Sequence, residues 1–131
     1  MILAVQKAIY ARLSDQITGA EIFDFMQQKK QYPAVIIGDS LGYENDTDTE
    51  NGFNETLTIH SWTSDSDSRG YSVLCGIMEQ IYNALHYYDL QVEGYGVSVI
   101  YQEFSEKMRD ADGLTRHGIQ RFKIIYEKVG A

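Results

Sequence analysis

The stretch GVSVIYQEFSEKMRDADGLTRHGIQRFKIIYEK, residues 96–128, decides how the C-terminal part of the chain folds. Two strand-like runs, Gly96–Phe104 and Gly118–Lys128, flank a polar segment that contains DADG. Aspartate side chains accept hydrogen bonds from the backbone that follows them, and glycine tolerates positive φ angles, so DADG is typical of a turn. The stretch therefore predicts a β-hairpin with a loop over residues 107–116. The residues expected to shape its bend are Asp110, Asp112, Gly113, His117 and Gly118, and the return strand is expected to start over Thr115, Arg116 and His117.

Apolar residues at spacings of three and four, which are typical of amphipathic helices, predict two helices. The stripes are Ile2, Val5, Ile9 and Leu13, and later Leu74, Ile77, Met78, Ile81 and Leu85. The first helix is expected to end in SDQITG around Gly19, while SDSDSRG, residues 64–70, supplies candidate N-caps for the second. Cys75 and Gly76 are expected to lie beside the second stripe, where small residues permit close packing.

Three further runs predict strands: EIFDFM (21–26), AVIIGDSL (34–41) and FNETLTIHSW (53–62). The last run alternates, and Leu57 and Ile59 mark its core face. The segment GYENDTDTENG, residues 42–52, is acidic and lacks aliphatic residues, so an exposed, mobile loop is expected there. Together these elements predict one α+β domain over residues 1–131. Its order is α-β-β-β-α-β-β, with a mostly antiparallel sheet and two helices packed on one face.

Length, charge and cysteine content limit the kinds of protein that this chain can be. The chain has 131 residues, a formal net charge of −8 and 44% hydrophobic residues, which is typical of one folded domain. The acidic balance argues against specific nucleic-acid binding through a basic patch. The only cysteine, Cys75, excludes an intramolecular disulfide, and a reducing compartment is expected. The sequence shows no signal peptide and no apolar run near the roughly 20 residues of a membrane helix, so a soluble intracellular protein without membrane contact is predicted.

The acidic clusters do not match a calcium loop, which needs glutamate at its twelfth position. Counting from Asp110 puts Arg121 at that position, and counting from Asp65 puts Gly76 there. The possible zinc ligands have none of the short spacings of zinc sites; they are His60, Cys75, His86 and His117. No metal site is predicted.

The sequence also lacks the usual motifs of enzymes. There is no GxSxG nucleophile elbow and no phosphate-binding glycine loop. Cys75 is expected to be buried on its helix, where thiols are usually inert. Asp110 and Asp112 could act as acid and base only if burial raised a pKa, and a polar loop tip argues against such burial. No catalytic residue and no cofactor are predicted.

The closing stretch RDADGLTRHGIQRFKIIYE, after VSVIYQEF, resembles the signature of tail completion (tail terminator) proteins of long-tailed, siphovirus-like bacteriophages and prophages. In that family a D-x-D-G-x-T-x-H-G stretch leads into an aromatic and basic final strand. Four other segments match in the same order: VQKAIYARL, IFDFMQQKKQYPAVIIGD, ETLTIHSWTSDSDSRG and IMEQIYNALHYYDLQVEG. The resemblance spans the chain from about Val5 to Glu127. It departs at Met26 and Gln27, where the family usually has Val-Pro, and in the unusual acidity of residues 42–52.

The resemblance implies a non-enzymatic assembly protein of the virion tail, assembled in the cytoplasm of the bacterial host. Such a protein is expected to form a hexameric ring at the head-proximal end of the tail tube, where it stops polymerisation and offers a surface to the head–tail connector protein. DNA is expected to pass through the ring without specific binding, which an acidic balance favours. The alternatives are another neck or connector component, or a small ligand-binding or enzyme domain with a pocket between sheet and helices.

A ring implies contact surfaces, and the sequence offers two candidates. His60 and Trp62 are predicted on the strand face opposite Leu57 and Ile59, where they either meet a neighbouring subunit or are covered by the same chain. The acidic loop either becomes ordered against a neighbour or the tail tube, or stays a solvated tether. Its candidate contact residues are Tyr43, Glu44, Asp46, Asp48 and Glu50.

Overall fold

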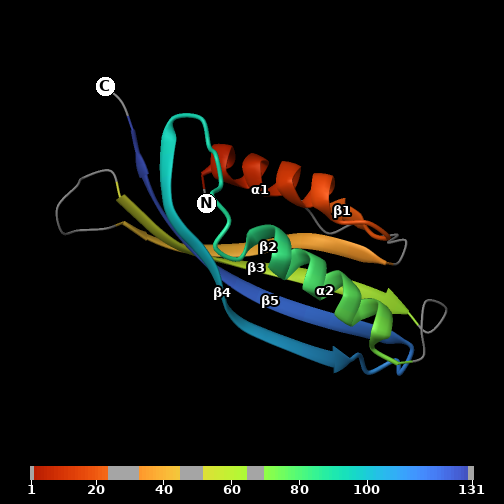
Figure 1. Ribbon diagram of the computed structural model, residues 1–131. Helices are drawn as coiled ribbons and strands as arrows, with labels where there is room; N and C mark the ends of the chain where they lie inside the picture. Colours follow the sequence, from red (N-terminus) through yellow and green to blue (C-terminus); the bar gives the residue numbers. More distant parts are fainter. Residues whose placement is uncertain (1, 24–32, 45–51, 65–69, 130–131) are drawn as a thin grey trace.

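The computed structural model describes residues 2–23, 33–44, 52–64 and 70–129, with the backbone alone for residues 39–44. These residues form two helices and five strands in the predicted order (Figure 1). The elements are α1 (Leu3–Gln16), β1 (Glu21–Phe23), β2 (Ala34–Glu44), β3 (Gly52–Ser64), α2 (Ser72–Leu85), β4 (Tyr95–Arg109) and β5 (Thr115–Lys128).

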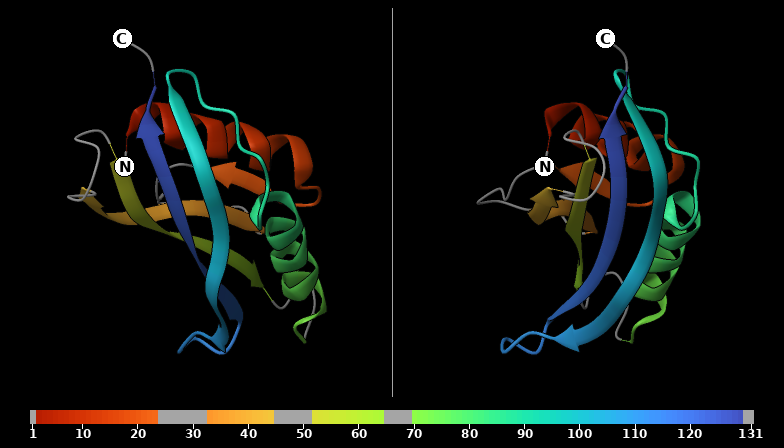
Figure 2. Two further views of the ribbon diagram at one scale, coloured as in Figure 1. Left: turned by 60° about the vertical axis from the view of Figure 1, so that its left-hand side comes forward. Right: turned by 90° about the vertical axis from the view of Figure 1, so that its left-hand side faces the viewer.

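The strands form one sheet in the order β1-β2-β3-β5-β4. Strand β1 runs parallel to β2, and the other neighbouring pairs are antiparallel. Both helices cover the same face of the sheet, with α1 toward β1 and α2 across β3, β5 and β4 (Figures 1 and 2). The predicted α+β fold, with a mostly antiparallel sheet and helices on one face, is confirmed.

The core lies between the helices and the covered face of the sheet. Alternate residues of β3 and β5 point toward the helices, because successive side chains of a strand leave on opposite faces. The inward positions of Leu57 and Ile59 are confirmed. Among the largest fully buried side chains are Phe122, Ile124 and Tyr126 of β5 and Ile9, Leu13 and Ile81 of the helices.

The hairpin loop expected over residues 107–116 is too long. Strand β4 continues to Arg109, and β5 begins at Thr115, so the turn comprises residues 110–114 only. The sheet extends through polar residues here because backbone pairing satisfies N–H and C=O groups whatever the side chains are. His117 and Gly118 therefore belong to β5 and do not shape the bend.

The acidic loop expected over residues 42–52 is also shorter than predicted. Residues 42–44 pair with β3 as part of β2, and Gly52 pairs with Glu127 of β5. Residues 45–51 lie outside the described residues. Of the first predicted strand, β1 takes up Glu21–Phe23, and residues 24–26 lie outside the description as well.

Helix α2 differs from expectation at its start. Its N-cap is Tyr71, whose side chain makes no capping bond, and residues 65–69 are not described. Cys75 is only half-buried, and an added Cβ at Gly76 would meet no atom within 4 Å. The expectation of close packing at these two positions is therefore wrong. The buried side of the helix is formed by neighbouring apolar residues such as Leu74 and Ile77. At the other end the C-cap is His86.

Neither described helix has the combination of length and apolar character needed to cross a bilayer.

Candidate functional site

The sheet face opposite the helices carries a stack of three rings. Trp62 and His117 lie face to face, with ring centroids 3.7 Å apart and an interplanar angle of 8°. His60 also contacts His117: Nδ1 of His60 lies 2.8 Å from Nε2 of His117. One of these nitrogens donates a hydrogen and the other accepts it. We call these three residues the His–Trp stack.

Three strands position the His–Trp stack. Trp62 of β3 pairs directly with His117 of β5, so their side chains leave the sheet side by side on the same face. On β2, Gly38 lies next to the His60 ring, and an added Cβ would sit 2.8 Å from Cδ2 of His60. Glycine at this position thus makes room for the imidazole. His60 and Trp62 lie on the predicted face, and His117 joins them there.

The helix-covered face holds a buried polar pair. The hydroxyl of Tyr126 on β5 donates a hydrogen bond to Oε1 of Glu55 on β3, and both residues are less than 5% exposed. Tyr126 also stacks on Phe53 with ring centroids 5.0 Å apart. Burial, followed by the hydrogen bond to Glu55, raises the pKa of the Tyr126 phenol. Because the pair is enclosed by the core, its role is structural.

The turn over residues 110–114 is held by local hydrogen bonds. One carboxylate oxygen of Asp112 accepts from the backbone N–H groups of Leu114 and Thr115, and the other accepts from the Thr115 hydroxyl. The amide of Gly113, at φ +72°, donates to the carbonyl of Asp110. The pKa of Asp112 lies below its usual value. The main cause is the hydrogen bond from the Thr115 hydroxyl, followed by the bonds from the amides of Thr115 and Leu114 and by the nearby Arg116. These carboxylate oxygens serve the turn.

Replacing Asp112 by alanine is expected to lower the Tm by a few degrees at neutral pH, because three hydrogen bonds of the turn lose their acceptor. The folded-state pKa of Asp112 is depressed, so its contribution is complete above about pH 4 and is lost as the pH falls further. The difference between variant and wild type should therefore shrink in acid. Asp110→Ala is the control, because the described hydrogen bonds of Asp110 come from its backbone. Equal losses in both variants at neutral pH would contradict this account.

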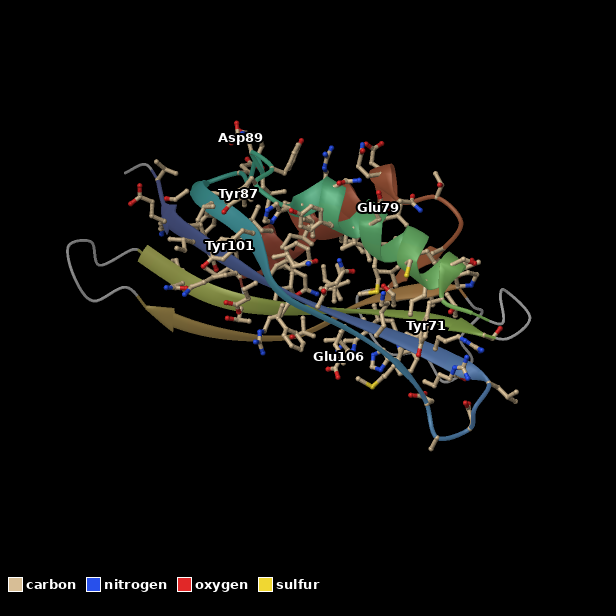
Figure 3. All side chains as sticks on the ribbon, turned by 60° about the horizontal axis from the view of Figure 1, so that its bottom comes forward. Tyr71, Glu79, Tyr87, Asp89, Tyr101 and Glu106 are labelled. Atoms are coloured by element: carbon tan, nitrogen blue, oxygen red, sulfur yellow. The ribbon has the colours of Figure 1, made fainter. Side chains whose placement is uncertain are left out.

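A cavity of about 330 Å³ lies between α2 and β4. Glu79 from α2 and Glu106 from β4 stand on its two sides (Figure 3). The ammonium of Lys107 donates to Sγ of Cys75 at 3.4 Å. The wall toward the core is Gln120, which is 2% exposed. We call this space the α2–β4 cavity; its remaining lining residues are Met78, Tyr82, Gln102 and Ser105.

The chemistry available at these places is that of contact and packing. Among the side chains placed in the structure, no three histidine, cysteine, aspartate or glutamate residues come together as a metal site would require. Asp112 is engaged by its own turn, and the Glu55–Tyr126 pair is enclosed. The His–Trp stack lies on the sheet face without helices, where His117 is buried and His60 and Trp62 are half-buried.

Two solved structures share this fold. A chain in the virion of the native gene transfer agent particle superposes with a TM-score of 0.77, covering 94% of each chain at 17% sequence identity. The SPP1 gp17 protein of bacteriophage SPP1 superposes with a TM-score of 0.56 at 23% identity, covering 97% of this chain and 89% of gp17. At these identities the likeness concerns the fold.

The sequence comparisons are more specific. The chain belongs to the tail completion protein gp17 family, whose model matches residues 7–127. The tail completion protein gp17 of Bacillus phage SPP1 is 30% identical over 88 residues, which cover 67% of this chain and 63% of that relative. The aligned part is therefore less than two thirds of the relative's length. The predicted family, the tail completion proteins, is confirmed.

The predicted contact residues are only partly brought together. His60 and Trp62 meet in one stack, and Tyr43 and Glu44 lie at the end of β2. Asp46, Asp48 and Glu50 fall outside the described residues. The return strand starts at Thr115 as expected, but the sequence prediction treated His117 as a residue that shapes the bend and so missed it as a member of the stack. Counting Thr115, His117 and Ile119 as one face of a strand would have found it.

Proposed function

We propose that this protein caps the head-proximal end of the phage tail tube, terminates tail polymerisation and supports head–tail joining as a ring of identical copies, with six as the expected number. It would act in the virion tail after assembly in the host cytoplasm. The observation that carries the proposal is the family match over residues 7–127, almost the whole chain. Its partners would be further copies of itself, the tail tube protein and the head–tail connector protein.

Two features of the protein support this proposal, the shape of the sheet and the net charge. A closed ring requires each copy to present two different surfaces that meet by rotation, and the sheet has unlike ends, a three-residue strand β1 and a fifteen-residue strand β4. The net charge of −8 also suits a ring through which DNA passes without sticking. The His–Trp stack is our candidate for a contact with the tube or a neighbour.

The test is the length of tail tubes assembled in vitro from the tube protein of the same phage. Adding this protein is expected to shorten the tubes in a concentration-dependent manner, with added density at one end in electron micrographs. Trp62→Ala is expected to weaken this effect at least several-fold, whereas Thr58→Ala, on the same face of β3, should leave it intact. Tubes of unchanged length would refute the capping role. Binding to the connector alone, without an effect on tubes, would favour another neck component.

A further inference from the structure

Strand β4 is the last strand of the sheet, and the segment that follows α2 covers part of its outer edge. The amide of Tyr87 donates to the carbonyl of Ile100 at 2.7 Å, and the amide of Gln102 donates to Nδ1 of His86 at 3.0 Å. Next along the strand, the residues Glu103–Lys107 are all exposed. We call His86 and Tyr87, with these two hydrogen bonds, the edge cover.

The imidazole of His86 stands in the edge cover where a further strand would have a backbone carbonyl. Such a strand would offer an N–H group to Ile100 and a C=O group to Gln102, but here the second partner is a side chain. Because the Gln102 amide is the donor, Nδ1 carries no proton, and the hydrogen of the neutral ring is on Nε2. A carbonyl accepts a hydrogen bond at any pH, whereas an imidazole nitrogen accepts one only while the ring is neutral.

Two tyrosine rings hold the imidazole in this position. Tyr82 of α2 stacks on it, with ring centroids 4.3 Å apart and an interplanar angle of 21°. Tyr87 lies against it with a centroid distance of 4.2 Å and an angle of 53°. Tyr101 of β4 continues the row, 6.1 Å from Tyr87 (Figure 3). These rings present Nδ1 of His86 to the Gln102 amide.

The charged side chains of the elements around His86 are engaged elsewhere or exposed. The guanidinium of Arg12 on α1 lies over the ring of Tyr88, 3.6 Å from its centroid. Glu103 of β4 pairs with Arg121. The carboxylates of α2 and of the segment after it belong to exposed residues, namely Glu79, Asp89 and Glu93. The described contacts of the imidazole are with two phenol rings and one amide, so its own charge decides whether the bond to Gln102 persists.

The same surroundings stabilise a protonated ring. His86 is the C-cap of α2, and a cation at the C-terminal end of a helix interacts favourably with the helix dipole. The faces of Tyr82 and Tyr87 attract a cation as well. The proton therefore meets one obstacle, the N–H group of Gln102, which the ring avoids by turning Nδ1 away from the strand.

We propose that His86 is a proton-operated latch on the edge of β4. Protonation of the ring, which histidines undergo between about pH 5 and pH 8, breaks the bond to Gln102, and the edge cover leaves the strand. Tyr87 adopts φ +56°, a conformation that is uncommon for residues other than glycine. Once one of the two bonds is lost, the strand no longer holds Tyr87 in that conformation. The uncovered edge then extends from Glu103–Lys107 back to Ile100, and the latch works in the single chain, whatever the protein assembles with.

Amide hydrogen exchange, followed by NMR on the isotope-labelled full chain, tests the latch. We expect the protection factor of the Gln102 amide, the ratio of its intrinsic to its measured exchange rate, to fall at least about tenfold between about pH 8 and pH 5. The Tyr87 amide should follow. The Phe122 amide, in β5 between β3 and β4, is the control and should stay protected. Equal protection of Gln102 at both pH values, or a fall whose midpoint differs from that of the His86 Cε1–H resonance, would overturn the proposal.

Two substitutions separate the charge of the His86 ring from its shape. His86→Asn replaces the ring by an amide that does not titrate, so the protection of Gln102 should no longer depend on pH. His86→Ala removes the acceptor, and Gln102 should exchange at neutral pH as freely as it does in the acidified wild type. His60 and His117 remain in both variants, so a pH effect that came from them would persist in His86→Asn and sink the latch. Wild-type protection in His86→Ala would do the same. The wild-type titration decides the matter alone if either variant fails to fold.

Discussion

Replacing Phe122 by alanine is expected to lower the free energy of unfolding by about 3–5 kcal/mol. Phe122 is fully buried at the centre of β5, where it pairs with Leu57 on one side and with Gln102 on the other. Removing the ring takes away its buried apolar surface and leaves a cavity that the strands on both sides cannot close. Urea or guanidinium unfolding, followed by circular dichroism, measures the loss.

Phe104 provides the control for this prediction. It is the same residue type on the neighbouring strand, but its side chain is 40% exposed on the face without helices. Phe104→Ala is expected to cost less than about 1 kcal/mol. A comparable loss in both variants would mean that the core does not lie between the helices and the sheet.

The second large effect is expected at the Glu55–Tyr126 pair. Tyr126→Phe removes the hydroxyl that donates to the buried Glu55 carboxyl, and the loss of a buried partner costs about 1–3 kcal/mol. Combining it with Glu55→Met removes both polar groups, and the double variant should be more stable than the sum of the single changes predicts. Additive losses in this double-mutant cycle would show that the two side chains do not interact.

The same pair gives the protein a dependence on alkaline pH. The pKa of Tyr126 is raised above its ordinary value of 10.0, so the folded state holds this proton more tightly than the unfolded chain does. The contribution of Tyr126 to stability is therefore complete below about pH 10 and is lost as the pH rises above it. The fall in Tm between pH 9 and pH 11, about the range of tyrosine titration, should be smaller for Tyr126→Phe than for the wild type. An identical fall in both would contradict this assignment.

Much of the fold follows from local patterns in the sequence. The spacing of Val5, Ile9 and Leu13 predicted α1, and the alternation around Leu57 and Ile59 predicted which side of β3 faces the helices. Both signals are strong because an amphipathic element has one arrangement that buries its apolar side. The turn chemistry of Asp112 and Gly113 likewise placed the hairpin correctly.

Features that depend on pairing between strands were not predictable in the same way. Strand ends were underestimated because polar residues such as Ser105 and Arg109 extend β4 through backbone bonds alone. The His–Trp stack requires the register that sets Trp62 opposite His117, and the sequence contains no local signal for that register. The α2–β4 cavity depends on the distance between α2 and the strand that follows it, and no local sequence pattern sets that distance.

The contact of His86 and Tyr87 with β4 also shortens the uncovered strand edge that is available for fibre formation. Amyloid spines are built from segments of about six or seven residues that stack edge to edge. Because these two residues cover β4 as far as Gln102, the run of consecutive exposed positions that follows is only five residues long, and Glu103, Glu106 and Lys107 within it are charged. A deletion that removed this segment from the strand would lengthen the uncovered edge and favour insoluble aggregates.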